Sequence, residues 1–183
     1  PRSSPVIDSD RVYTYGAEGK LHCLNLKTGN VIWKRNLLQE FNVSQDFFGI
    51  ASTPLIEGKF LIVLLGAPNG PTVGAFDKFT GELIWGTEDQ WGASYASPIP
   101  ATVNGKRRIF VFAGGESRPP TGGLLSINPT DGAIDFRFPW RSQSYESVNA
   151  SCPVIIGDQV FISASYKTGG ALINTSPKNS PSR

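Results

Sequence analysis

Short segments in which apolar and polar residues alternate recur along the whole chain, with Gly, Asn or Asp between them. Alternation with a period of two, bounded by turn residues, predicts short antiparallel strands rather than helices. At the start of the chain the predicted strands are 5–7, 11–15, 20–26 and 31–34. Apolar runs at 60–65 and 108–113 predict buried strands further along. The pattern therefore indicates an all-β protein.

Two sequence landmarks repeat along the chain. The first is a Ser-rich approach to a proline, in "SSPVI", "ASTPLI", "ASPIP" and "ASCPVII". The second is a glycine turn followed four residues later by a large aromatic side chain, at Gly29 with Trp33, Gly81 with Trp85, and Gly132 with Phe136. Glycine permits the positive φ of a tight turn, and a flat ring fills the gap where neighbouring sheets diverge. We interpret these residues as structural.

Four antiparallel strands in every 45 to 50 residues, roughly, are typical of a β-propeller blade. The predicted blades cover residues 4–42, 51–91, 96–142 and 150–176, and the last of them has three strand patterns instead of four. We therefore expect one partial β-propeller domain over 1–183, with four-stranded antiparallel blades and about three and a half blades present. Because open ends expose blade faces, we expect an incomplete gene product or a fragment; completion of the ring by oligomerisation is the alternative.

The segments "GAEGKLHCLNLKTGNVIW" and "VGAFDKFTGELIW" resemble the pyrroloquinoline-quinone (PQQ)-type propeller repeat. That repeat runs roughly Gly-x-Leu-x-Ala-Leu-Asp-x-x-Thr-Gly-x-x-x-Trp. The third unit departs from it, with Asp131 in place of Thr and Phe136 in place of Trp. The resemblance covers nearly the whole chain and is closest to the BamB-like bacterial envelope proteins.

The resemblance implies a non-catalytic propeller that acts as a protein-interaction or ligand-binding scaffold. It implies a periplasmic or secreted protein of the cell envelope, with other envelope proteins or the missing blades of the same chain as partners. The alternative is a fragment of a PQQ-dependent quinoprotein dehydrogenase, which would need PQQ and calcium. Such enzymes commonly carry a vicinal Cys-Cys pair, which this chain lacks. We therefore expect no cofactor and no metal under the favoured interpretation.

Composition narrows the function classes further. A net charge of +2 gives no reason to expect nucleic acid as a partner. No apolar run approaches the ~20 residues needed to cross a bilayer. Cys23 and Cys152 lie far apart, without the spacing of a zinc or redox motif, and are expected in the core. The single histidine, His22, is expected to face outward from a strand.

The loops that enter the first strand of each blade carry the groups that could contact a ligand. In this architecture such loops face one end of the central channel, where ligands tend to bind. The predicted ligand-binding residues are Asp46, Phe48, Trp91, Tyr95, Arg141, Tyr145, Glu146 and Asn149. For each of them a structural role, as a plug between blades or a turn cap, is the competing interpretation.

Overall fold

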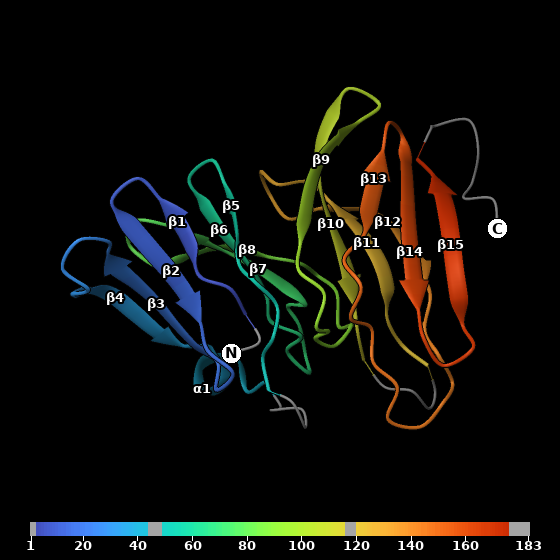
Figure 1. The fold of residues 1–183 in the computed structure, drawn as a ribbon, viewed down its shortest axis with the longest axis horizontal. Coiled ribbons are helices and arrows are strands. Elements are labelled where there is room, and N and C mark those ends of the chain that lie inside the picture. Colours follow the sequence, from blue (N-terminus) through green and yellow to red (C-terminus); the bar gives the residue numbers. More distant parts are fainter. Residues whose placement is uncertain (1–2, 44–48, 116–119, 176–183) are drawn as a thin grey trace.

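The computed structural model describes residues 3–43, 49–115 and 120–175, and their fold is four antiparallel sheets. The sheets lie side by side in chain order, from β1–β4 at one side to β13–β15 at the other (Figure 1). We call them blades 1 to 4. The strands are β1 (Val6–Asp8), β2 (Arg11–Tyr15), β3 (Lys20–Asn25), β4 (Val31–Asn36), β5 (Leu55–Glu57), β6 (Phe60–Leu64), β7 (Val73–Asp77), β8 (Leu83–Gly86), β9 (Ile99–Val103), β10 (Lys106–Ala113), β11 (Gly123–Ile127), β12 (Ile134–Pro139), β13 (Val154–Ile156), β14 (Gln159–Ala164) and β15 (Gly169–Asn174).

Within each blade the strands follow one another in sequence order. Blades 1 to 3 have four strands, and blade 4 has three in the described residues. All pairings are antiparallel, and β1 also contacts β5, which in turn contacts β9. The first strands of successive blades are therefore neighbours. This is the all-β, partial propeller that the sequence predicted.

The glycine turn that joins the third and fourth strands has the same geometry in blades 1 to 3. Gly29, Gly81 and Gly132 have φ of 73°, 78° and 77°, in the region that glycine adopts without steric cost. The backbone N–H groups of Lys27 and Thr28 donate to Asn25 Oδ1, at 3.1 and 2.9 Å. Asp77 and Asn128 accept equivalent bonds in blades 2 and 3. The Asn or Asp four residues before the glycine thus closes the turn.

Each inner blade is apolar on both faces. We call the face turned toward the preceding blade the leading face, and the face turned toward the next blade the trailing face. In blade 2, Leu61 and Val63 point from β6 into a cluster shared with blade 1, whereas Ile62 and Leu64 point into one shared with blade 3. A third cluster lies between blades 3 and 4. The near-continuous apolar runs of the second strands follow from this burial on both faces.

The tryptophan after the turn glycine of blade 1, and that of blade 2, packs on the turn of the next blade. Trp33 is partly buried, and its indole Nε1–H donates to Lys78 O at 3.1 Å. Trp85 is 8 % exposed and donates to Pro129 O at 3.2 Å. Lys78 and Pro129 each lie three residues before the turn glycine of their own blade. The contact is therefore the same at two successive interfaces.

The turn glycines are required by these rings as well as by their backbone conformation. A Cβ at Gly81 would lie 2.8 Å from the Trp33 ring, and a Cβ at Gly132 would lie 2.5 Å from the Trp85 ring. Gly29, on blade 1, has no atom within 4 Å of such a Cβ in the described part of the chain. The three turns therefore share a backbone conformation and differ in whether an aromatic ring covers them.

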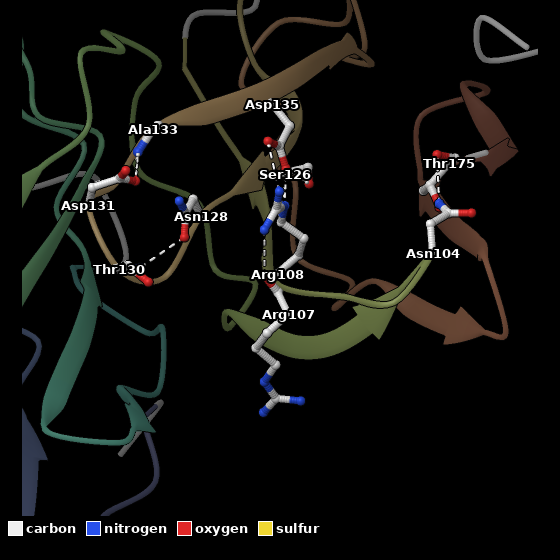
Figure 2. Close-up of polar contacts among 10 residues, drawn as sticks. All are labelled: Asn104, Arg107, Arg108, Ser126, Asn128, Thr130, Asp131, Ala133, Asp135 and Thr175. Carbon is white, nitrogen blue, oxygen red and sulfur yellow. Dashed lines mark hydrogen bonds and ion pairs between the residues drawn. The ribbon is translucent and has the colours of Figure 1, made fainter. Parts of the chain in front are cut away.

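Polar contacts also connect neighbouring blades, near the same turns. Lys78 Nζ lies 2.6 Å from Asp8 Oδ2, between blades 2 and 1. Arg107 Nε lies 2.8 Å from Glu57 Oε1, between blades 3 and 2. Between blades 3 and 4, Asn104 Nδ2 donates to Thr175 O at 2.8 Å, as Figure 2 shows. A polar link therefore accompanies the apolar contact at each of these interfaces.

Figure 2 also shows a contact inside blade 3. Arg108 of β10 reaches Asp135 of β12, with Nη2 3.2 Å from Oδ1, and Ser126 of the intervening strand β11 lies 3.4 Å from the same carboxylate. Arg107 points the other way, toward blade 2. The two adjacent arginines therefore differ in role, because Arg108 binds within its own blade and Arg107 binds to the neighbouring blade.

A short helix, α1 (Leu37–Phe41), follows the fourth strand of blade 1 and was not expected from the strand pattern. Asn36 caps it by accepting a bond from Gln39 N, and Asn42 ends it with a left-handed backbone. Leu37 is buried in the cluster between blades 1 and 2. The helix therefore covers the end of blade 1.

The two cysteines differ in their surroundings, and both are free thiols. Cys23 is buried between blades 1 and 2, and burial raises the pKa of its thiol. Cys152 is exposed, and its Sγ accepts a bond from Ser97 N at 3.3 Å. The expected core position is correct for Cys23 and wrong for Cys152, which lies in the connection to blade 4 rather than on a strand.

Matched glycine substitutions test the contact between ring and turn. Gly29→Ala and Gly132→Ala both force alanine into a left-handed conformation, at about 1–2 kcal/mol, but Gly132→Ala also presses a methyl group against Trp85. We expect Gly132→Ala to lower the free energy of unfolding in urea by about 1–3 kcal/mol more than Gly29→Ala. Equal losses from the two substitutions would contradict this account.

The same contact can be removed from the side of the ring. We expect Trp85→Ala to lower the free energy of unfolding by about 3–5 kcal/mol, and Trp33→Ala, which is less buried, to lie toward the lower end of that range. With Trp85 replaced by Ala, the further substitution Gly132→Ala should cost no more than Gly29→Ala. If Gly132→Ala still destabilises the protein more than Gly29→Ala when Trp85 is Ala, a contact other than the one with the Trp85 ring causes the difference.

Candidate functional site

One end of the propeller is built from the connections between blades and from the turns between second and third strands. The connections run over these turns and are bonded to them. Ile50 N donates to Ala17 O at 3.0 Å, Thr72 N to Asp89 O at 3.1 Å, and Gly114 N to Gly92 O at 3.0 Å. The six predicted ligand-binding residues that the structure describes belong to this end. Asp46 and Phe48 lie outside the described residues.

Trp91 and Tyr95 lie in the connection between blades 2 and 3. Trp91 is partly buried against the cluster that these two blades share, and its carbonyl accepts a 2.6 Å bond from Thr72 Oγ1. Tyr95 is partly buried, and its backbone N–H donates to Asn149 O at 3.0 Å. With Ser52 and Ser94 it lines a small cavity of about 10 Å³, which is the size of one water molecule. Both residues therefore take part in contacts within the propeller.

Arg141 and Asn149 fix the two ends of the loop that leads to blade 4. Asn149 is 1 % exposed, and its Nδ2 donates to Ala113 O at 2.9 Å and to Trp140 O at 3.2 Å. Arg141 donates to Ser147 Oγ at 2.6 Å and to Gly115 O at 3.0 Å. The loop is thus tied to the turn of blade 3 and to itself.

Tyr145 and Glu146 form the exposed tip of this loop. Tyr145 is 71 % exposed, and Glu146 has a left-handed backbone with φ of 55°. Ser147 N donates to Ser144 O at 3.2 Å and closes the turn beneath them. We call residues 141–149 the Tyr145 loop. The six described candidate residues therefore divide into four that contact the propeller and two that project into solvent.

A buried carboxylate that was not predicted lies in the connection between blades 2 and 3. Asp89 is 4 % exposed, and its Oδ1 accepts bonds from Trp91 N at 2.7 Å and Thr72 Oγ1 at 3.2 Å. Its Oδ2 lies 2.5 Å from Arg137 Nε on the outer strand of blade 3. Asp89 therefore links the two blades. Arg137 lies 48 residues away in sequence, so no local pattern pairs them.

The described residues do not fit a metal-dependent quinone site. They contain no group of three or more His, Cys, Asp and Glu side chains placed to hold a metal ion. Calcium requires six to eight oxygen ligands, several of them from converging carboxylates.

His22 is partly buried on β3, paired across the sheet with Thr14. In the part of the chain that the structure describes, no helix has the length and apolar character needed to span a bilayer.

Paired substitutions measure what the Asp89 contact contributes. Asp89→Asn keeps the shape of the side chain but removes the charge that faces Arg137, inside a buried site. We expect it to lower the free energy of unfolding in urea by about 1–3 kcal/mol. Glu57→Gln, in the more exposed pair with Arg107, should cost no more than about 1 kcal/mol. Equal losses would mean that burial does not strengthen the Asp89 contact.

Solved structures with this fold include a BamB protein and a dehydrogenase. BamB from Moraxella catarrhalis superposes with a TM-score of 0.61 at 17 % identity, over 95 % of this chain and 46 % of that one. A europium-containing methanol dehydrogenase superposes with a TM-score of 0.67 at 10 % identity, over 94 % of this chain and 39 % of that one. At these identities the similarity is one of fold alone.

Sequence comparison is more specific. The outer membrane protein assembly factor BamB of Legionella pneumophila (strain Paris) is 26 % identical over 162 residues, which are 87 % of this chain and 37 % of that protein. The assembly factor BamB of Aliivibrio fischeri (strain ATCC 700601 / ES114) is 46 % identical over 44 residues, 24 % of this chain and 11 % of that protein. The chain thus spans little more than a third of the Legionella protein. The sequence profile of the family described as outer membrane protein assembly factor BamB matches residues 1–181, and the chain belongs to that family of PQQ-type propellers.

Proposed function

We propose that this protein is a non-catalytic propeller scaffold of the bacterial envelope that binds another protein through the Tyr145 loop. The observation that carries the proposal is an exposed aromatic side chain on a firmly anchored loop. Tyr145 is 71 % exposed, whereas Ser142, Ser147 and Asn149 beside it are buried. Tyrosine is among the residue types enriched at the positions that contribute most of the binding energy in protein interfaces.

The anchoring of the loop favours affinity. Ordering a flexible loop on binding costs free energy, which a loop that is already fixed by Arg141 and Asn149 avoids. Tyrosine supplies a large contact area with two side-chain torsions to restrict, and its hydroxyl keeps a hydrogen-bonding group at the rim. Glu146 beside it adds a charge that selects for a basic partner. The expected partner surface is therefore a pocket for an aromatic ring with a Lys or Arg at its edge.

Family membership indicates where such a partner is found. The curated relatives are named outer membrane protein assembly factors. On that basis we place the protein in the periplasm or elsewhere in the cell envelope, and we propose a component of outer membrane protein assembly as the partner. The similarity to dehydrogenases supports the fold and adds nothing to this assignment.

The proposal is tested by photocrosslinking in the bacterium that produces the protein. A photoreactive phenylalanine analogue at position 145 is expected to capture a component of outer membrane protein assembly, identified by mass spectrometry. With that partner purified, Tyr145→Ala should weaken binding by roughly 30-fold, the loss of about 2 kcal/mol that a central aromatic contact contributes. Isothermal titration calorimetry measures the dissociation constant.

A matched control lies at the opposite end of the propeller. Phe79 is also an exposed aromatic, and it belongs to the glycine turn of blade 2. Phe79→Ala should leave the dissociation constant unchanged, and the photoreactive analogue at position 79 should not capture the same partner. A partner that is captured at position 79 and not at 145, or that binds Tyr145→Ala as tightly as the native chain, would overturn the proposal.

The dehydrogenase alternative is separated by a direct binding measurement. The described residues hold no carboxylate cluster for calcium, so we expect the protein not to bind PQQ with calcium present. Tryptophan fluorescence reports this, because a bound quinone beside any of the four tryptophans quenches their emission. Saturable quenching that requires calcium, with dye reduction on addition of an alcohol, would favour the dehydrogenase.

A further inference from the structure

A buried hydroxyl near the channel end of blade 2 lies beside a small cavity. Ser52 is 2 % exposed, and no residue in the described part of the chain forms a hydrogen bond with its Oγ. Ser52 also lines the cavity of about 10 Å³ that Tyr95 borders. Burying a hydroxyl without a partner costs free energy, so native proteins rarely leave one in that state. The cavity is therefore the place to look for the partner of Ser52.

Leu64 of β6 lines the same cavity, and its main chain is turned toward the connection that carries Ser52. The partner of Leu64 in β7 is Val73, whose N–H and C=O both bond to Thr87 on the other side, at 3.1 and 2.9 Å. A residue of an antiparallel strand directs both main-chain groups to one side, so Leu64 and Val73 share no hydrogen bond. The N–H and C=O of Leu64 therefore point to the side of β5, where that connection enters the blade.

Blade 3 shows how a hydroxyl binds the same main-chain position. Phe112 is the counterpart of Leu64, because each lies two residues beyond the residue that pairs with the first position after the proline. The Ser94 hydroxyl donates to Phe112 O at 2.6 Å and accepts a bond from Ala96 N at 3.2 Å. A serine of the connection that enters blade 3 thus satisfies a carbonyl of its second strand.

Blade 2 has an isoleucine where blade 3 has this serine. Ile50 lies four residues before Pro54, as Ser94 lies four residues before Pro98. The side chain of Ile50 is buried in the cluster between blades 1 and 2 and has no hydrogen to donate. The groups that remain in blade 2 are a hydroxyl at Ser52 and the main chain at residue 64, and both residues line the cavity.

We propose that the cavity holds one water molecule, which accepts a hydrogen bond from Ser52 Oγ and donates one to Leu64 O, in place of the Ser94 hydroxyl of blade 3. The volume is that of a single water, and two protein partners are the fewest that a buried water typically has. Ser94 lines the cavity too, and its Oγ has a second lone pair for the other hydrogen of the water. The water therefore joins the connection between blades 1 and 2 to the connection between blades 2 and 3.

A high-resolution crystal structure of the protein tests the site directly. We expect electron density for one ordered water within roughly 2.5–3.0 Å of both Ser52 Oγ and Leu64 O. In crystals of Ser52→Ala this density should be weaker or absent, because the water has lost a partner. A cavity without density in the native protein, or a water that bonds to only one of the two atoms, overturns the proposal.

The sign of the stability change in Ser52→Ala provides a second test. Alanine removes the hydroxyl and adds no bulk. Loss of the bond to the water is expected to raise the equilibrium constant of unfolding, measured in urea, by roughly two- to tenfold. A buried hydroxyl without water would have no bond to lose, so its removal would leave that constant unchanged or lower it. Either of these results overturns the proposal.

A matched control lies at the same position of the repeat. Ser151 precedes Pro153 by two residues, as Ser52 precedes Pro54, but Ser151 is exposed. Its hydroxyl exchanges bonds freely with bulk water, so Ser151→Ala should leave the equilibrium constant of unfolding unchanged. An increase as large as that from Ser52→Ala would assign the effect to the serine position itself rather than to the cavity, and would overturn the proposal.

Discussion

The contact between neighbouring blades is the interaction on which the rest of the structure depends. An inner blade is apolar on both faces, and each face is buried only where a neighbouring blade packs against it. The aromatic ring on the turn glycine fixes the spacing and angle of the two sheets, because the ring lies where a Cβ would otherwise be. Its indole N–H bonds to the next blade and satisfies a donor that would otherwise be buried without a partner. At the interfaces of blades 1 and 2 and of blades 2 and 3, one tryptophan thus sets both the position and the orientation of the neighbouring sheets.

Much of this architecture follows from local sequence, because each part of it is repeated. The turn residues, the strands and the glycine-to-aromatic spacing recur, and repetition separates them from chance. The helix α1 escaped prediction because it occurs once and is only five residues long. Cys152 was expected in the core on general grounds of residue type, but it lies in a connection whose exposure the sequence does not reveal.

The candidate site was less predictable, and the reason is again physical. Loops at the channel end are rich in Ser, Tyr, Asn and charged residues whether they bind a ligand or anchor the chain. Arg141 and Asn149 contact backbone carbonyls that come from other parts of the fold, and Asp89 contacts an arginine of the next blade. Such partners are set by how the blades pack, which residue type does not encode. Burial in the structure is what separates the anchoring residues from Tyr145 and Glu146.

The residues that hold the blades together are separate from the exposed residues at the loop tips. This separation explains how one fold serves both assembly factors and dehydrogenases. The blades are held together near the glycine turns, by rings and ion pairs that involve no residue of the Tyr145 loop. The connections at the other end can change in sequence as long as their anchoring bonds persist, since the blade contacts do not depend on what the loop tips carry. Function in this protein is therefore to be sought in the exposed loop tips, where side chains are not already committed to holding the blades together.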